Sequence, residues 1–80
     1  MYAYYPQMNA ADIAALNARI DRLAASFTSL DRAAVTRVVC ETAYLLVAER
    51  DARGGAVYVN QREHAGCYAR PDGGVEALQR

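Results

Sequence analysis

The sequence predicts a small single α+β domain over residues 1–80, in which a hairpin of two antiparallel helices is followed by a short β-hairpin. Apolar residues recur at helical spacing over 10–27 and again over 30–53, and β-branched residues alternate at period two from residue 56. The 80 residues fall below the usual domain size of about 100–150 residues. The chain is therefore expected to hold one modest core.

The first predicted helix follows an aromatic arm at 1–8 that Pro6 closes. Asn9 is typical of a helix N-cap, and Asp12 stands three residues later, as in a variant of the capping box. Apolar side chains then recur three and four residues apart, at Ile13, Leu16, Ile20, Leu23 and Phe27. This spacing predicts a helix over 10–27 with these side chains on its buried face.

A second helix is predicted over 30–53. Thr28 and Ser29 interrupt the first pattern, and either hydroxyl is suited to cap the next helix, with Asp31 in its first turn. The glycine pair at 54–55 is typical of a helix C-terminus. The predicted core face consists of Val35, Val38, Val39, Thr42, Leu45 and Leu46. The short connection between the helices favours an antiparallel arrangement.

The opposite side of this second helix carries side chains that are unusual on a solvated face. They are Arg37, Cys40, Glu41, Tyr44, Val47 and Ala48. Either the last third of the chain or a second subunit is expected to cover them. Because a small alanine-rich chain gains core from a partner, we expect a homodimer. Its candidate interface residues are Cys40, Tyr44, Val47 and Cys67, and Cys67 is also a candidate for an intermolecular disulfide.

The residues after the glycine pair predict a β-hairpin over 56–70, with a tail at 71–80. If Val59 pairs with Cys67, side chains alternate so that two faces form. One face then carries Val57, Val59, Cys67 and Ala69, and the other carries Tyr58, Tyr68 and Arg70. Because an isolated hairpin is marginally stable, the apolar face is expected to pack on the helices.

Motifs for catalysis or metal binding are lacking in the sequence. His64 and Cys67 have an H-x-x-C spacing, but zinc needs three or four ligands and no C-x-x-C pair occurs. A thiol nucleophile at Cys67 or Cys40 lacks a group to orient His64 as its base. The glycine doublets follow no strand, so they do not form a phosphate loop. We therefore expect no catalytic residues, no metal and no cofactor.

Charge and hydropathy bear on partners and location. All nine basic residues are arginine, and nine acidic residues balance them to a net charge of zero. Direct nucleic-acid binding is therefore not expected, because phosphate contacts supply most of its affinity. Charges interrupt every apolar run before the ~20 residues of a membrane span. The N-terminus lacks a secretory signal, so we expect the cytoplasm of a bacterial host cell and no membrane partner.

The predicted partner-binding residues are Tyr58, Tyr68 and Arg70, with Arg62 in the connecting loop. Tyrosine and arginine are enriched at protein recognition surfaces. The function that the sequence favours is non-catalytic, stoichiometric binding to a protein partner. A small nucleic-acid-binding regulator or antitoxin is the alternative, and a thiol- or metal-dependent enzyme ranks last.

In overall profile the chain resembles small inhibitors carried by phages and mobile elements, the anti-CRISPR proteins among them. The resemblance covers the length of 80 residues, the helical hairpin, the short β piece at 56–70 and the lack of an enzymatic motif. These families share no common motif, so the resemblance assigns no functional residue. It implies binding to a CRISPR effector subunit and a block of DNA recruitment by occlusion. Small antitoxins and sigma-factor regulators share the same profile.

Overall fold

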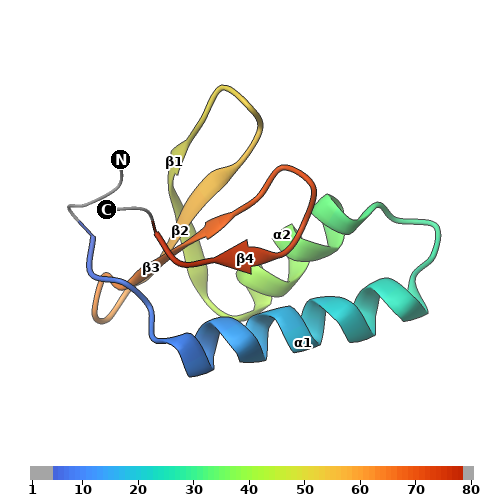
Figure 1. The fold of residues 1–80 in the computed structure, drawn as a ribbon, viewed down its shortest axis with the longest axis horizontal. Helices are drawn as coiled ribbons and strands as arrows, with labels where there is room; N and C mark the ends of the chain where they lie inside the picture. Colours follow the sequence, from blue (N-terminus) through green and yellow to red (C-terminus); the bar gives the residue numbers. More distant parts are fainter. Residues whose placement is uncertain (1–4, 79–80) are drawn as a thin grey trace.

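Two helices pack on one face of a four-stranded antiparallel sheet in the computed structural model, which describes residues 5–78 (Figure 1). The strands lie in chain order, β1-β2-β3-β4. The predicted fold class, a small α+β domain with two helices ahead of antiparallel strands, is confirmed. The sheet has two more strands than the predicted hairpin, and residues 1–4 of the predicted arm lie outside the described residues.

Helix α1 (Ala10–Ser26) matches the predicted helix closely. The side chain of Asn9 caps it by accepting a hydrogen bond from the backbone N–H of Asp12 at 2.8 Å. Leu16 and Ile20 are buried against the rest of the molecule. Phe27, at the C-cap, is 51 % exposed, so the predicted apolar seam ends before it.

Helix α2 (Arg32–Thr42) is much shorter than the predicted 30–53. Asp31 is its N-cap and accepts a hydrogen bond from the N–H of Ala34 at 2.7 Å, so neither predicted hydroxyl caps it. The predicted core face is also wrong in part, because Val38 is exposed. The buried residues of the helix are Val35, Thr36, Val39 and Cys40. The prediction included Leu45 and Leu46 in the helical arc, although the helix ends before them.

Strand β1 (Leu45–Arg50) occupies the segment that was predicted to continue the second helix. The helix ends because Tyr44 adopts a left-handed backbone conformation, with φ of 61°. β1 then pairs antiparallel with β2 (Ala56–Asn60). The glycine pair at 54–55 therefore closes a β-hairpin turn and does not end a helix. Gly54 fits there because its φ is 96°, a conformation that side chains disfavour.

The pairing of β2 with β3 (Gly66–Ala69) differs by one residue from the predicted register. Tyr58 lies opposite Cys67, whereas the prediction placed Val59 there. Because side chains alternate, a shift of one residue moves one strand's set to the other face. The core under the helices includes Ala56, Tyr58, Cys67 and Ala69, whereas Val57, Val59 and Tyr68 belong to a separate cluster.

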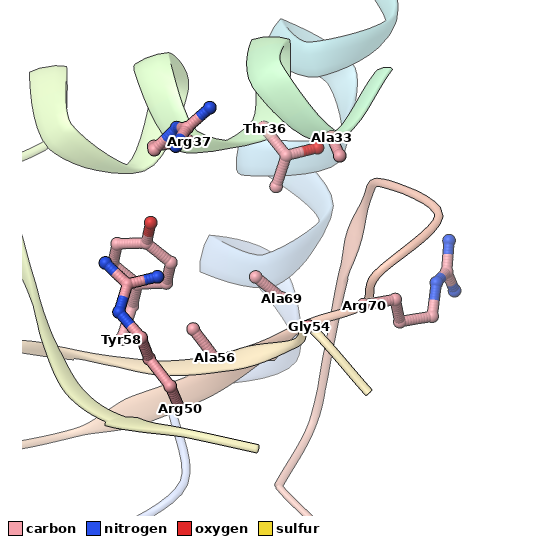
Figure 2. A pocket seen from close by; sticks show the side chains of 9 residues that line it. All are labelled: Ala33, Thr36, Arg37, Arg50, Gly54, Ala56, Tyr58, Ala69 and Arg70. Carbon is pink, nitrogen blue, oxygen red and sulfur yellow. The ribbon is translucent and has the colours of Figure 1, made fainter. Parts of the chain in front are cut away.

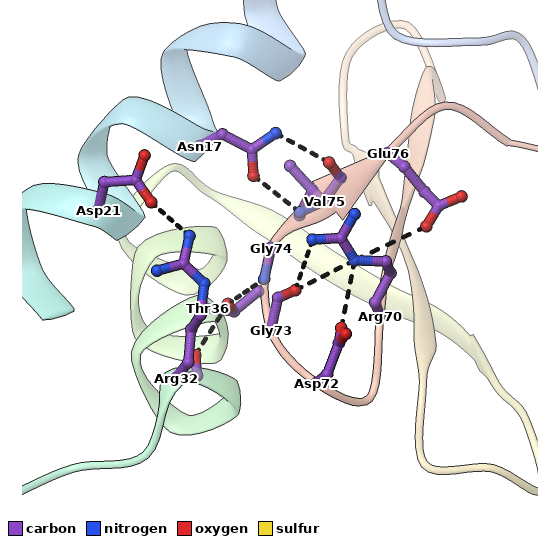
Figure 3. A network of polar contacts seen from close by, with 10 residues as sticks. All are labelled: Asn17, Asp21, Arg32, Thr36, Arg70, Asp72, Gly73, Gly74, Val75 and Glu76. Atoms are coloured by element: carbon purple, nitrogen blue, oxygen red, sulfur yellow. Dashed lines mark hydrogen bonds and ion pairs between the residues drawn. The ribbon is translucent and has the colours of Figure 1, made fainter.

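Strand β4 (Val75–Glu76) lies within the predicted tail and is held by both helices (Figure 3). The side-chain amide of Asn17 on α1 donates to the carbonyl of Val75 and accepts from its N–H, both at 2.9 Å. Thr36 on α2 accepts from the N–H of Gly74 at 2.8 Å. Two helix side chains thus satisfy backbone groups of the last hairpin as a neighbouring strand would.

The segment before α1 pairs with the other end of β3. Gly66 donates its N–H to the carbonyl of Pro6 at 2.8 Å and accepts from the N–H of Met8 at 2.9 Å. The side chain of Gln7 donates to the carbonyl of Leu78 at 2.8 Å. β4 and this segment therefore cover the side of β3 that faces away from β2, and β1 forms the other edge of the sheet.

Candidate functional site

The four residues predicted to bind a partner do not form one surface. Tyr58 is buried under the helices, and Tyr68 is buried in the other cluster of the sheet. Arg62 is exposed in the β2–β3 turn, and Arg70 follows β3. The one-residue shift of the register is the reason that the two tyrosines separate.

Tyr68 has a specific structural partner. Its hydroxyl donates a hydrogen bond to the carboxylate of Asp51, in the β1–β2 turn. Asp51 also accepts from the backbone N–H groups of Arg53 at 3.0 Å and Gly55 at 2.9 Å. The Tyr68 bond, then the two N–H bonds and the nearby Arg53 charge, lower the pKa of Asp51. The same Tyr68–Asp51 bond raises the pKa of Tyr68.

The head group of Arg70 is held by its own hairpin. Its Nε lies 3.2 Å from Asp72 Oδ1 and 3.8 Å from Glu76 Oε1. It also donates to the carbonyl of Gly73, at 3.0 Å from Nη2. These bonds stabilise the β3–β4 turn (Figure 3). Because these bonds engage the guanidinium, Arg70 is less available to bind a partner than the sequence prediction assumes.

Both cysteines are free thiols in the core and are fully buried. Burial raises the pKa of Cys40 to about 11 and that of Cys67 to about 12. Both thiols are therefore protonated and unreactive at neutral pH. The prediction that they lie at a dimer interface, with a possible disulfide at Cys67, is wrong, because they face the packed helix and sheet.

The other two predicted interface residues, Tyr44 and Val47, lie at the exposed edge of the sheet. Tyr44 is 84 % exposed and Val47 is 36 % exposed. Leu46 lies between them in sequence and is 52 % exposed. We call these three residues, with the backbone of β1 that faces away from β2, the β1 edge surface. The sequence prediction placed Leu46 in the core, because it treated the segment as helical.

A second exposed apolar cluster lies where the helices connect. Phe27, Leu30 and Val38 are about half exposed, and with Leu23 and Val35 they line a hollow of about 150 Å³. It is distant from the β1 edge surface, at the opposite end of α2.

An arginine-lined pocket of about 220 Å³ lies between α2 and the sheet (Figure 2). Arg37 comes from α2, Arg50 from the end of β1 and Tyr58 from β2. Small residues leave the space open, namely Ala33, Gly54, Ala56 and Ala69, and Thr36 and Arg70 complete the lining. Figure 2 shows the Tyr58 hydroxyl directed from the sheet toward α2, whereas the Arg70 head group points away. The sequence prediction missed this pocket because Arg50 was assigned to a helix.

Within residues 5–78, no group of three His, Cys, Asp or Glu side chains is placed to hold a metal ion. His64 is exposed in the β2–β3 turn while Cys67 is buried in the core, so the H-x-x-C spacing does not create a pair. In the same part of the chain, no helix has the length and apolar character to cross a bilayer.

The geometry thus offers two surfaces for function, the β1 edge surface and the arginine-lined pocket. Comparison of the chain with protein-family models, with curated proteins and with solved structures finds no match.

Proposed function

We propose that the chain is a non-catalytic protein-binding domain that acts by stoichiometric contact through the β1 edge surface. One observation carries the proposal. Among the described residues, β1 has a pairing strand on one side only, and the exposed Tyr44, Leu46 and Val47 lie on or beside it.

An edge strand presents unpaired N–H and C=O groups, which are a template for another chain. The opposite side of the sheet is closed, because β4 and the segment around Gln7 pair with β3. At β1 a bulge between Val47 and Glu49 is the sole interruption of the register with β2. Bulges limit uncontrolled edge pairing, so this edge is suited to a specific partner more than to open aggregation.

The proposed occupant is an extended segment of another protein that adds a strand beside β1. Antiparallel self-pairing over all six residues of β1 would place Glu49 opposite Leu46 and Arg50 opposite Leu45. Cross-strand pairs are stabilising when apolar residues or opposite charges meet. A complementary segment is therefore apolar against Leu46 and Val47, and carries opposite charges against Glu49 and Arg50. The homodimer predicted from the sequence is the competing occupant.

In its most specific form, the proposal makes the chain a phage-type inhibitor whose partner is a CRISPR effector subunit. This form rests on the resemblance in size and profile. Binding of an extended segment of the effector beside β1 would block DNA recruitment by occlusion. Purified effector complexes titrated with the protein are then expected to lose DNA binding at a ratio near one to one.

The general proposal is tested by capture from bacterial lysate, with and without nuclease. The immobilised proteins are the wild type, the double variant Leu46→Lys/Val47→Lys, and Phe27→Lys as the matched control. All three substituted residues are exposed and apolar, so the control changes the same chemistry at a surface distant from β1. Light scattering of each variant measures its oligomeric state.

The proposal predicts a stoichiometric protein complex that survives nuclease, is lost with Leu46→Lys/Val47→Lys and is retained with Phe27→Lys. Loss of the captured proteins on nuclease treatment would favour the nucleic-acid regulator instead. A wild-type dimer that only the β1 double variant dissociates would assign the edge to a second copy. Equal capture by all three proteins would remove the β1 edge surface from the proposal.

A further inference from the structure

The arginine-lined pocket is a second candidate site, and protein binding at the β1 edge surface does not require it. We infer that this pocket binds a phosphoryl group, with the guanidinium groups of Arg37 and Arg50 and the hydroxyl of Tyr58 as its donors. The inference is independent of the proposed function, because it concerns a cavity between α2 and the sheet.

The first support is that two arginines line the pocket without an ion-pair partner among the described residues. Neither Arg37 nor Arg50 has a carboxylate within 4 Å or a hydrogen-bonded partner among residues 5–78. Of the nearby acids, Glu41 lies one turn after Arg37 on α2 and forms no ion pair with it among the described residues, and two others are engaged or directed elsewhere. Asp51 is bonded to Tyr68, and Glu49 pairs with Val57, which belongs to the cluster on the other face of the sheet.

Cross-strand geometry places Arg50 beside Tyr58. Arg50 lies opposite Ala56, and Tyr58 is two residues further along the same strand, so both side chains lie on the helix side of the sheet. Such diagonal neighbours are within reach of long side chains. Arg37 lies on α2, across the pocket from these two residues (Figure 2).

The second support is the Tyr58 hydroxyl. Tyr58 as a whole is only 3 % exposed, but its hydroxyl is not fully buried: it opens into the pocket and has no hydrogen-bond partner in the described part of the chain. A tyrosine hydroxyl that is open to a pocket is available to donate a hydrogen bond to a bound group. Burial raises the pKa of Tyr58, with smaller contributions from Cys40 and Glu41, while Arg50 and Arg37 act in the opposite direction. At neutral pH the group is thus a protonated donor.

These donors match a phosphoryl group better than a carboxylate. Arginine presents a planar fork that binds phosphate oxygens in pairs. A phosphate monoester carries about −1.5 to −2 charge at pH 7 and three acceptor oxygens, enough for two guanidiniums and a hydroxyl. A carboxylate supplies one charge and two oxygens. The source of the phosphoryl group is either inorganic phosphate or a nucleoside monophosphate.

Calorimetric titration in chloride buffer at constant ionic strength tests the inference. The probes are inorganic phosphate, adenosine 5′-monophosphate, adenosine and acetate. The variants are Arg37→Gln, Arg50→Gln and Tyr58→Phe, and Arg62→Gln is the matched control, because Arg62 is exposed in a turn outside the pocket. Tyr58→Phe removes only the hydroxyl, and circular dichroism verifies that each variant is folded.

We expect saturable binding of both phosphoryl probes and a loss of about tenfold or more with either pocket arginine replaced. Tyr58→Phe is expected to weaken binding about threefold to tenfold. Equal affinities for the two probes would point to the free anion, and tighter monophosphate binding would point to a nucleotide. Absence of saturable phosphate binding, equally tight acetate binding, or an equal loss with Arg62→Gln would overturn the inference.

Discussion

Tyr68 and Asp51 link the β1–β2 turn to β3 through one side-chain hydrogen bond. Asp51 also accepts from two N–H groups of its own turn, which is the local geometry that an Asp side chain favours. A residue that was predicted to contact a partner is thus a structural residue. Its partner lies 17 positions earlier in the sequence, so no local pattern identifies it.

The Tyr68–Asp51 bond makes stability depend on pH in two windows. Because the folded-state pKa of Asp51 is lowered, its stabilisation is present above about pH 4 and is lost as pH falls through the folded-state pKa. Because the pKa of Tyr68 is raised, its contribution is present below about pH 10 and is lost at higher pH. Tyr68→Phe is expected to lower the melting temperature at pH 7. It is also expected to make the melting temperature depend less on pH in both the acidic and the alkaline window.

Thermal denaturation between about pH 2 and pH 11 measures this prediction. Glu63→Gln is the control, because Glu63 is exposed in the β2–β3 turn. If Tyr68→Phe and the wild type lose stability in parallel at both ends of the range, the hydrogen bond does not have the assigned role.

At the scale of elements, the passage from α2 to β1 depends on one residue. Tyr44 has φ of 61°, and a left-handed conformation costs a residue with a Cβ about 1–2 kcal/mol. Tyr44 is 84 % exposed, so its ring contributes little burial. Tyr44→Gly is therefore expected to stabilise the fold by up to about 1 kcal/mol.

Urea denaturation measures the free energy of unfolding of this variant, with Tyr44→Ala as the control. Alanine removes the same ring but keeps the Cβ, so it is expected to give no gain. Equal effects of glycine and alanine would show that the backbone conformation at residue 44 is not strained.

A second element-scale prediction concerns the anchoring of β4. Asn17 exchanges two hydrogen bonds with the backbone of Val75. Asn17→Ala leaves both groups without these partners and is expected to reduce the free energy of unfolding by about 1–3 kcal/mol. Arg22→Ala, an exposed change on the same helix, is the control. If the free energy of unfolding falls no more than in Arg22→Ala, water fully replaces the two hydrogen bonds of the Asn17 amide.

The elements differ in how far local sequence determines them. α1 is predictable because Asn9 caps it and its apolar residues recur at helical spacing. β1 is not, because Leu45 and Leu46 extend the same arc and no glycine or proline separates them from α2. The glycine pair at 54–55 is equally typical of a helix C-terminus and of a hairpin turn. Tertiary pairing with β2 decides between them, as it often overrides helix propensity.

At the scale of the whole molecule, the candidate sites also depend on contacts between distant residues, which local sequence does not determine. The sequence predicts Tyr44 and Val47 as interface residues on the outer side of a helix, whereas in the structure they are exposed on or beside an edge strand. The arginine-lined pocket combines residues from α2, β1 and β2, so it depends on topology and register. The buried positions of Cys67 and Tyr58 depend on the same two features, and a one-residue change of the β2–β3 register would move these two side chains to opposite faces of the sheet.

The central claim is that a protein partner pairs with β1. Amide hydrogen exchange of the chain, alone and with the captured partner, tests it most directly. We expect increased protection of the amides of residues 45–50 in the complex, while those of the β2–β3 turn remain unchanged. Unchanged exchange in β1, with new protection around Phe27 or at another surface, would contradict the claim.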